Sequence, residues 1–231
     1  FYDIFQFKHS RHVAFVIADV CDKGVGAALF MVLFRSLLRA FSEIKIKDET
    51  IHEQLQTIIV NTNDFIAEYH GKSNMYATLF FGILDPDTGI LYYINGGHEP
   101  PIIVDKTGAV IERLMPTGAA VGMFPDMVFR SEQYQFNDGD FMVGFTDGTT
   151  DARNASGVQF SEDRLLNNIA HPWTSIFSML FELNVELQKH IGEQKQFDDI
   201  TLISFRRAAQ EERHAICRTA HLHNLDDLRR F

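Results

Sequence analysis

Hydrophobic positions along the first third of the chain follow a strand-like pattern and then a helical one. The run VAFVI at residues 13–17 is β-branched and aromatic, which predicts a buried strand. GAALFMVLFRSLLRAF at residues 26–41 predicts a helix, and because it is apolar on nearly all sides we expect it to be largely buried. Residues 49–69 place apolar side chains three and four positions apart, which predicts a second helix with one buried face.

The middle of the chain changes to short apolar runs separated by Gly, Pro, Asn and Asp. Residues 76–84 and 90–95, joined by the turn DPDTG, predict a β-hairpin. The further elements that the pattern predicts are strands at 101–104, 110–114, 128–136 and 141–145, helices at 161–170 and 174–191, and a last strand at 200–205.

This order of elements indicates an α+β fold. Consecutive hairpins make mainly antiparallel sheets, and helices that come in pairs must cover sheet faces. We therefore expect a four-layer α-β-β-α sandwich of two mainly antiparallel sheets flanked by helix pairs, formed by residues 1–207 as one domain. The tail at 208–231 is polar and rich in His and Arg, and we expect it to be a C-terminal helix or the start of a further module.

Composition and charge narrow the classes of function. The 231 residues are 45% hydrophobic and 23% charged, which is typical of a globular protein, and the formal net charge is −10. An acidic chain is a poor candidate for binding nucleic acid, because such binding relies on basic side chains that neutralise phosphates. An acidic surface is compatible with collecting cations.

The cysteines and the first residues of the chain indicate where in the cell the protein is expected. Cys21 and Cys217 are far apart and form no disulfide framework, which favours a reducing compartment. No apolar run approaches the 18 or so residues needed to cross a bilayer, and the opening lacks the pattern of a signal peptide. We expect a cytoplasmic protein, either by itself or as the cytoplasmic part of a larger sensor protein.

Acidic residues stand at three places where an apolar strand meets a turn. Asp19 ends the first strand, Asp147 ends another, and Asp198 precedes the last one. Carboxylates gathered at neighbouring strand ends repel one another unless a cation intervenes, and hard oxygen ligands suit Mg²⁺ or Mn²⁺. Taken singly, Asp19 could instead cap the following helix, Asp147 could be an ordinary turn residue, and Asp198 could be an exposed residue at a strand start.

Four motifs in order give the chain a family resemblance. ADVCDKGVGAALFM, ATLFFGILDPDTGILYYINGGHEPPIIV, GDFMVGFTDGTTDARN and FDDITLISF resemble the SpoIIE-like branch of the PPM metal-dependent protein serine/threonine phosphatases. The resemblance covers residues 1–207 and implies the same α-β-β-α sandwich. It also implies that Asp19 bridges two Mn²⁺ or Mg²⁺ ions, that the Val20 carbonyl joins one of them, and that Asp147 and Asp198 hold the second.

The resemblance implies a reaction and partners. Two such ions activate a water molecule that attacks phosphoserine or phosphothreonine on a regulatory protein, here an anti-sigma-factor antagonist. An upstream sensor module, and a homodimer contact through the helices at 26–41 and 49–69, are further expectations. The alternative is a catalytically weak or inactive phosphatase-fold module that binds a signalling partner.

Some positions depart from the family pattern. An upstream Gly-Gly-Asp motif is not in the sequence, so we expect the domain to be truncated at its start, and Asp3 either substitutes for the missing carboxylate or is structural. Cys21 stands where many relatives have a proton-donating His, which leaves protonation of the leaving group to water. His98 is expected to hold a turn by hydrogen bonds rather than to act as an acid or ligand.

Overall fold

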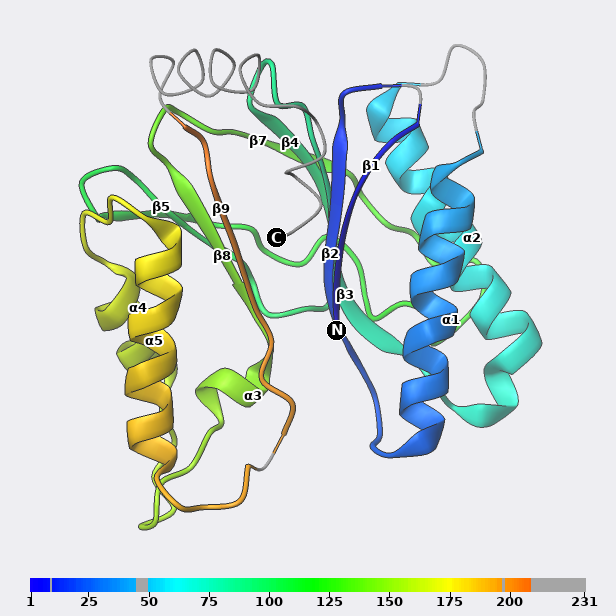
Figure 1. The fold of residues 1–231 in the computed structure, drawn as a ribbon. Coiled ribbons are helices and arrows are strands. Elements are labelled where there is room, and N and C mark those ends of the chain that lie inside the picture. Colours follow the sequence, from blue (N-terminus) through cyan, green and yellow to red (C-terminus); the bar gives the residue numbers. More distant parts are fainter. Residues whose placement is uncertain (9, 45–49, 197, 209–231) are drawn as a thin grey trace, which may run out of the picture.

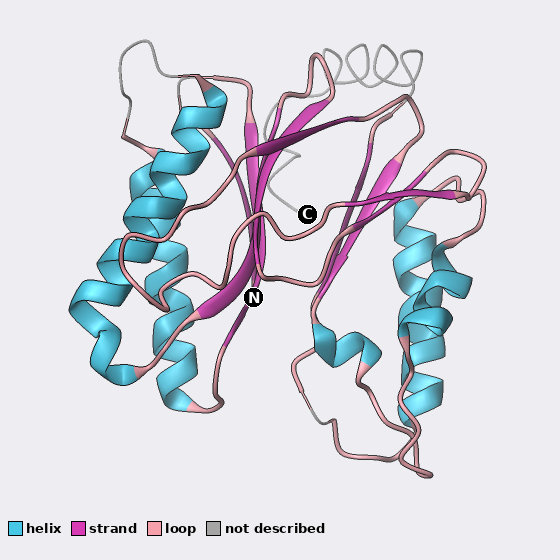
Figure 2. Ribbon diagram, turned by 180° about the vertical axis from the view of Figure 1, so that it is seen from behind, coloured by secondary structure: helices cyan, strands magenta, loops and turns pink. Residues whose placement is uncertain are grey.

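The computed structural model describes residues 1–8, 10–44, 50–196 and 198–208. These residues form four layers, in which two β-sheets face each other and a pair of helices covers the outer face of each sheet (Figures 1 and 2). The predicted α-β-β-α sandwich is therefore confirmed. The tail at 208–231, apart from its first residue, lies outside the described residues.

The first sheet has five strands, and every neighbouring pair is antiparallel. Asp19 of β2 lies opposite Thr78 of β3, one residue before the end of β2, so its carboxylate lies at one end of the sheet. The strands lie in the order β1-β2-β3-β4-β7, with the bounds β1 (Tyr2–Gln6), β2 (Val13–Val20), β3 (Ala77–Leu84), β4 (Ile90–Gly96) and β7 (Glu132–Gln135).

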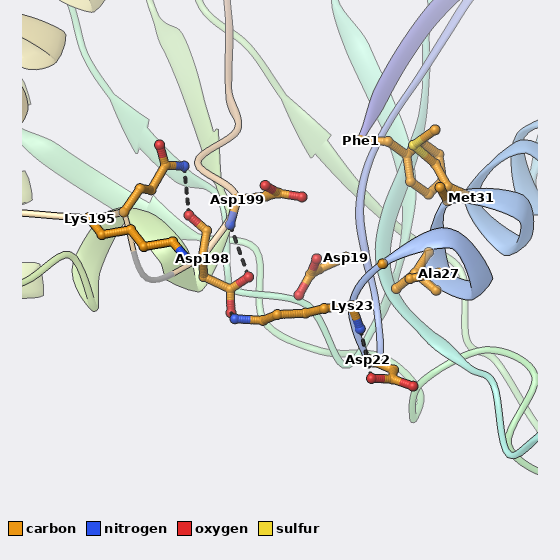
Figure 3. A pocket seen from close by; sticks show the side chains of 13 residues that line it. Phe1, Asp19, Asp22, Lys23, Ala27, Met31, Lys195, Asp198 and Asp199 are labelled. Carbon is orange, nitrogen blue, oxygen red and sulfur yellow. Dashed lines mark hydrogen bonds and ion pairs between the residues drawn. The ribbon is translucent and has the colours of Figure 1, made fainter.

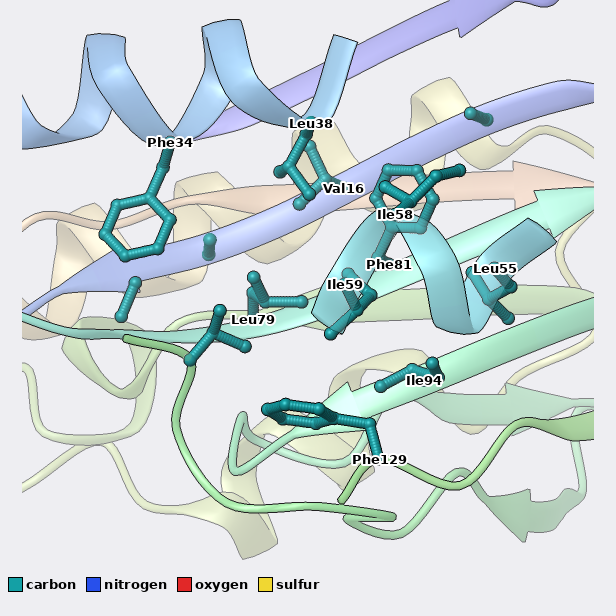
Figure 4. Close-up of a cluster of buried hydrophobic side chains, with 14 of the residues drawn as sticks. Val16, Phe34, Leu38, Leu55, Ile58, Ile59, Leu79, Phe81, Ile94 and Phe129 are labelled. Carbon is teal, nitrogen blue, oxygen red and sulfur yellow. The ribbon is translucent and has the colours of Figure 1, made fainter. Parts of the chain in front are cut away.

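Helices α1 (Val25–Ser42) and α2 (Ile51–His70) cover this sheet, and the one-turn 3₁₀ helix η1 (Gly71–Ser73) follows α2. Helix α2 begins at a capping box, in which the Thr50 hydroxyl accepts from the Glu53 N–H and the Glu53 carboxylate accepts from the Thr50 N–H. Buried side chains from both helices, including Phe34 and Ile58, meet Phe81 of β3 in a continuous core (Figure 4).

Helix α1 departs from two expectations. Only three of its 18 residues are buried, and Val25, Leu29 and Val32 are 79%, 66% and 55% exposed, so the expectation of a largely buried helix is wrong. By length and composition it is also apolar enough to cross a membrane, contrary to the expectation that no run is. Its buried side chains nevertheless pack on the sheet of this domain.

The second sheet has four antiparallel strands and its own helix pair. Its order is β6-β5-β8-β9, and its core against the helices includes Val143, Phe145, Leu165 and Leu183. The elements of this half are β5 (Ile102–Val104), β6 (Val110–Arg113), β8 (Phe141–Phe145), α4 (Glu162–Ile169), α5 (Ile176–Ile191) and β9 (Leu202–Arg206).

A third buried cluster joins the two sheets. Phe15 and Phe80 from the first sheet meet Met142 and Ile203 from the second, and all four are at most 5% exposed. This packing fixes the two sheets against each other. The ends of β2 and β8 thereby come to the same end of the sandwich, on the side of the short helix α3 (Asp147–Thr150) in Figure 1.

Two elements differ from the prediction. The strand expected at 128–136 is confined to β7, because Phe129 turns into the core under α1 and α2 and its carbonyl accepts from the Gln56 side chain at 3.2 Å. Helix α3 was not expected, since a single turn of helix has no periodicity that a sequence pattern can reveal.

Candidate metal centre

Strand β2 brings Asp19 to the end of the first sheet, where the chain turns sharply into α1. Asp22 and Gly24 adopt left-handed backbone conformations with φ of 70° and 88°, which turn the chain away from the sheet. The N-cap of α1 is Gly24, and no side chain caps this helix. Asp19 therefore does not serve as a helix cap, and the alternative that it does is wrong.

Strand β8 and the segment before β9 bring two further acidic residues to the same end. The Thr146 hydroxyl donates to the Asp199 carbonyl and accepts from the Thr201 N–H, both at 3.0 Å. A Cβ at Gly148 would lie 2.4 Å from the Asp199 carbonyl oxygen. Only glycine allows this close approach, which holds Asp147, the first residue of α3, beside the segment that carries Asp198.

An open cleft of about 650 Å³ lies between the two sheets at this end. Its lining includes Asp19, Val20, Asp198 and Asp199, and Figure 3 shows the aspartates around the same space. The structure thus brings three of the four sequence-predicted metal residues to one cleft. The fourth, Asp147, is not part of the lining, although its charge acts on Asp19.

The electrostatics of the cleft show mutual repulsion between carboxylates. Burial raises the pKa of Asp19, and the negative charges of Asp147 and Asp198 raise it further. Burial also raises the pKa of Asp147, where the nearby charge of Asp198 adds to it. Each carboxylate is therefore costly to ionise without a cation nearby.

The donor set fits hard divalent cations. Carboxylate oxygens and the Val20 backbone carbonyl are ligands that Mg²⁺ and Mn²⁺ prefer. In the described part of the chain, however, no three His, Cys, Asp or Glu side chains are close enough to enclose an ion as they stand. Asp198 instead contacts a cationic side chain, with Lys23 Nζ 3.2 Å from its Oδ2.

Asp3 lies away from this cleft. Its carboxylate, 7% exposed, accepts hydrogen bonds from Arg39 at 2.5 and 2.8 Å and forms an ion pair with Arg35 at 3.0 Å. Burial works to raise the pKa of Asp3, but these two guanidinium groups outweigh it and lower the pKa to about 2. Of the two expectations for Asp3, the structural one holds.

His98 is buried near the centre and holds a turn, as expected. The backbone N–H of His98 donates to the side-chain oxygen of Asn95 at 2.8 Å, and the ring Nδ1 is 2.9 Å from the Thr78 hydroxyl. Burial lowers the pKa of His98 to about 4, so the ring is neutral near pH 7.

Three charged residues near the centre have no role in the sequence prediction. Lys23 and Lys195 line the cleft, and the pKa of Glu99 is raised by burial and then by the charges of Asp147 and Asp151. Lys23 and Glu99 stand inside motifs that the sequence shows, so their positions could have drawn attention. Nothing in the sequence near Lys195 indicates that it reaches the cleft.

The fold and the acidic end of the sandwich define a PP2C-type phosphatase architecture. The SiaA-PP2C domain of Pseudomonas aeruginosa matches 89% of this chain and 79% of that chain, with a TM-score of 0.73 and 19% sequence identity. The RsbU and RsbW domains of a Mycobacterium tuberculosis protein match 90% of this chain and 56% of theirs, with a TM-score of 0.68 and 24% identity. These likenesses establish the fold.

The chain belongs to the SpoIIE family, because the family model for Stage II sporulation protein E (SpoIIE) matches residues 9–208. It is thus a SpoIIE-like domain of the PPM phosphatases, and the resemblance expected from its motifs is confirmed. Protein IcfG of Synechocystis is 41% identical over 226 residues, and phosphoserine phosphatase RsbU of Bacillus subtilis is 25% identical over 214 residues. Each match covers 90% of this chain but only 35% and 58% of those proteins, respectively.

Proposed function

We propose that this domain hydrolyses phosphoserine or phosphothreonine on a regulatory protein of the anti-sigma-factor antagonist type, using two divalent ions. The observation that carries the proposal is the gathering of Asp19, Val20 and Asp198 in one cleft of a SpoIIE-family domain, with Asp147 close enough to raise the pKa of Asp19. The name of RsbU, a phosphoserine phosphatase, supports the choice of substrate.

The residues of the cleft have separate tasks in this proposal. Asp19 would be shared between the ions, the Val20 carbonyl would assist one of them, and Asp147 and Asp198 would hold the other. Such ions lower the pKa of a bound water, orient it toward phosphorus and offset the charge of the phosphoryl oxygens. The carboxylates that are costly to ionise together supply the negative charge that attracts the cations.

Protonation of the leaving group is assigned to water. His98 is buried, bonded to Thr78 and neutral near pH 7, so it is not a proton donor there. The Cys21 thiol, at the position where many relatives have His, contacts the Asn74 carbonyl at 3.6 Å. The serine alkoxide that leaves the phosphorus therefore takes its proton from solvent in the open cleft.

Phosphate release from a serine-phosphorylated anti-sigma-factor antagonist, with Mn²⁺ or with chelator, tests this function. We expect Mn²⁺-dependent release that falls by about 100-fold or more in Asp19→Asn, Asp147→Asn and Asp198→Asn, because each removes a ligand. Asp87→Asn is the matched control, because Asp87 lies in the turn between β3 and β4, outside the cleft lining, and forms an ion pair with Arg11. Near wild-type turnover in two of the three folded variants would overturn the site.

A partner-binding module without catalysis is the second candidate. It is favoured by the finding that no three metal-binding side chains among the described residues enclose an ion as they stand. Folded protein that binds the phosphorylated antagonist firmly, yet releases no phosphate at any Mn²⁺ concentration, would select this candidate over the first.

We further propose that α1 contacts either an upstream sensor module or a second copy of the chain. Its exposed apolar side chains, Val25, Leu29 and Val32, support this. The helix also follows the short turn that leads away from Val20, the last residue of β2, so a contact there would bear on the centre. Activity that changes neither with protein concentration nor with the presence of an upstream module would contradict it.

A further inference from the structure

The Lys23 side chain reaches across the acidic cleft from the turn between β2 and α1. Its Nζ lies 3.2 Å from Oδ2 of Asp198, which comes from the segment before β9 in the other half of the sandwich. Figure 3 shows the chain of Lys23 extending past Asp19 to the Asp198 carboxylate. The Lys23 side chain is 60% exposed and that of Asp198 is 32% exposed, so the contact lies at the open side of the cleft.

The backbone around Lys23 sets its direction. Asp22 accepts from the Lys23 N–H at 2.8 Å, and both neighbours of Lys23, Asp22 and Gly24, have positive φ. A non-glycine residue in this region is uncommon and needs local support, which the Asp22 side chain gives here. Lys23 is thus presented by a defined turn that starts at the end of β2 and leads into α1.

Lys23 also acts electrostatically on the acidic residues beside it. Asp198 and Asp147 repel each other, and the positive charge of Lys23 works against the rise in the pKa of Asp147. A single ammonium group therefore contacts one of the proposed metal ligands and partly neutralises a second. Without a metal ion, the ammonium group of Lys23 thus offsets part of the negative charge in the cleft.

We propose that Lys23 is a tethered counter-cation that competes with divalent ions for Asp198 and so sets the metal concentration at which the centre fills. The inference rests on the proposed function, because it takes Asp198 as a metal ligand. Both oxygens of Asp198 already have a partner, because Lys23 Nζ lies 3.2 Å from Oδ2 and the Asp199 N–H donates to Oδ1 at 2.9 Å. A metal ion that binds this carboxylate therefore has to displace the ammonium group or share an oxygen with it, and the two positive charges then repel each other. Metal binding is accordingly weaker than the carboxylates alone would make it.

Calorimetric titration of Mn²⁺ into the metal-free chain tests the competition without relying on turnover. Lys23→Met should bind Mn²⁺ about two- to fivefold more tightly, which is the range that an exposed ion pair contributes. Lys23→Arg, which keeps the charge, should bind Mn²⁺ as weakly as the wild type. Lys195→Met is the matched control, because it removes the same charge from the same cleft lining and leaves the contact between Lys23 and Asp198 in place.

The outcomes separate this inference from the function on which it rests. Unchanged Mn²⁺ affinity in Lys23→Met, or an equal gain in Lys195→Met, would overturn the competition while leaving the metal centre intact. Mn²⁺ binding that is the same in Asp198→Asn as in the wild type would remove Asp198 from the centre and overturn both. Lys23→Gln provides a second variant with a polar side chain, so that a folding defect of Lys23→Met does not decide the result.

Discussion

The carboxylate of Asp19 is placed where it costs the fold stability. It is half-buried at the end of β2, with the charges of Asp147 and Asp198 nearby. A carboxylate whose pKa is raised on folding destabilises the native state at a pH above that pKa, because the folded chain holds the proton more firmly than the unfolded chain. Carboxylates with a raised pKa beside other charges in a cleft are typical of functional sites, which is the role proposed for Asp19.

Asp19→Asn should therefore raise the midpoint of thermal unfolding of the metal-free chain at pH 7, while it abolishes Mn²⁺-dependent phosphatase activity. The amide keeps the shape of the side chain and removes the repulsion. Thermal melts in chelator, followed by circular dichroism, measure the effect. A lower midpoint for the variant than for the wild type would show that the carboxylate is structural.

His98 gives a pH dependence of stability with a defined sign. The pKa of His98 falls to about 4 in the fold, whereas it is about 6.5 in the unfolded chain. Between these two pH values the imidazole is protonated in the unfolded chain but stays neutral in the folded one. We expect the free energy of unfolding to fall by up to about 3 kcal/mol between pH 6.5 and 4. In His98→Gln this portion of the slope should vanish, whereas parallel urea-unfolding curves for both proteins would contradict the assignment.

At this scale the sequence predicts some site residues and not others. Asp19 and Asp198 could be found because a carboxylate at the end of an apolar strand is visible in the sequence. Lys23 and Glu99 stand inside visible motifs, but their contacts at the centre could not be predicted, because these depend on side-chain direction and on neighbours distant in the sequence. The role of Asp3 was open until the structure placed Arg35 and Arg39 beside it.

Among the elements, α1 connects the proposed metal centre to β1, the edge strand of the first sheet. Its first residues follow the turn that begins after Val20 and carries Lys23, and its later turns are tied to β1 by the ion pairs of Asp3. Arg39 also lies over the ring of Phe5 on the same strand, 4.6 Å from its centroid. One end of the helix thus belongs to the cleft, and the other is anchored to the edge strand of the first sheet.

Asp3→Asn should loosen this anchor. Lowering of the Asp3 pKa to about 2 corresponds to a stabilisation of about 2 kcal/mol at neutral pH, which is present above about pH 4 and is lost as the pH falls through 2. We expect the variant to lose about this much in urea unfolding at pH 7, and the difference from the wild type to shrink at acid pH. A difference that persists at pH 2 would point to lost packing instead of lost ion pairs.

The pattern of the sequence gives most elements but not their surroundings. Helix α1 was correctly predicted as a helix, yet its exposure was not, because a helix that is apolar on all sides does not reveal which layers cover it. The strand expected at 128–136 ends up as β7 alone, since the apolar residue Phe129 serves the helix-side core and not the sheet. Tertiary packing decides both cases.

For the whole molecule, the candidate centre depends on the two sheets being packed together. Asp19 and Val20 come from the first sheet, whereas Asp147 and Asp198 flank strands of the second. The buried cluster between the sheets holds the two halves in this relation, and it includes an edge contact between Phe15 of the first sheet and Phe205 of the second, with ring centroids 5.0 Å apart. The sequence predicted the four layers, because alternating helix pairs and hairpins leave few other ways to bury their apolar faces.

Phe80→Ala should destabilise the whole domain by about 3–5 kcal/mol, because it empties a fully buried position between the sheets. Ile203→Val, in the other sheet, should cost about 0.5–1.5 kcal/mol and gives a milder test. Urea unfolding monitored by circular dichroism and by Trp173 fluorescence should give coincident transitions for both variants. Separate transitions would mean that the halves fold independently.

The most direct test of the account is a crystal structure of the protein with Mn²⁺, using the anomalous signal of the metal. The account predicts two anomalous peaks in the cleft, with Asp19 coordinating both ions and Asp147 and Asp198 coordinating one of them. Crystals of protein that releases phosphate in the presence of Mn²⁺, but that show no metal within coordination distance of Asp19, would contradict the central claim.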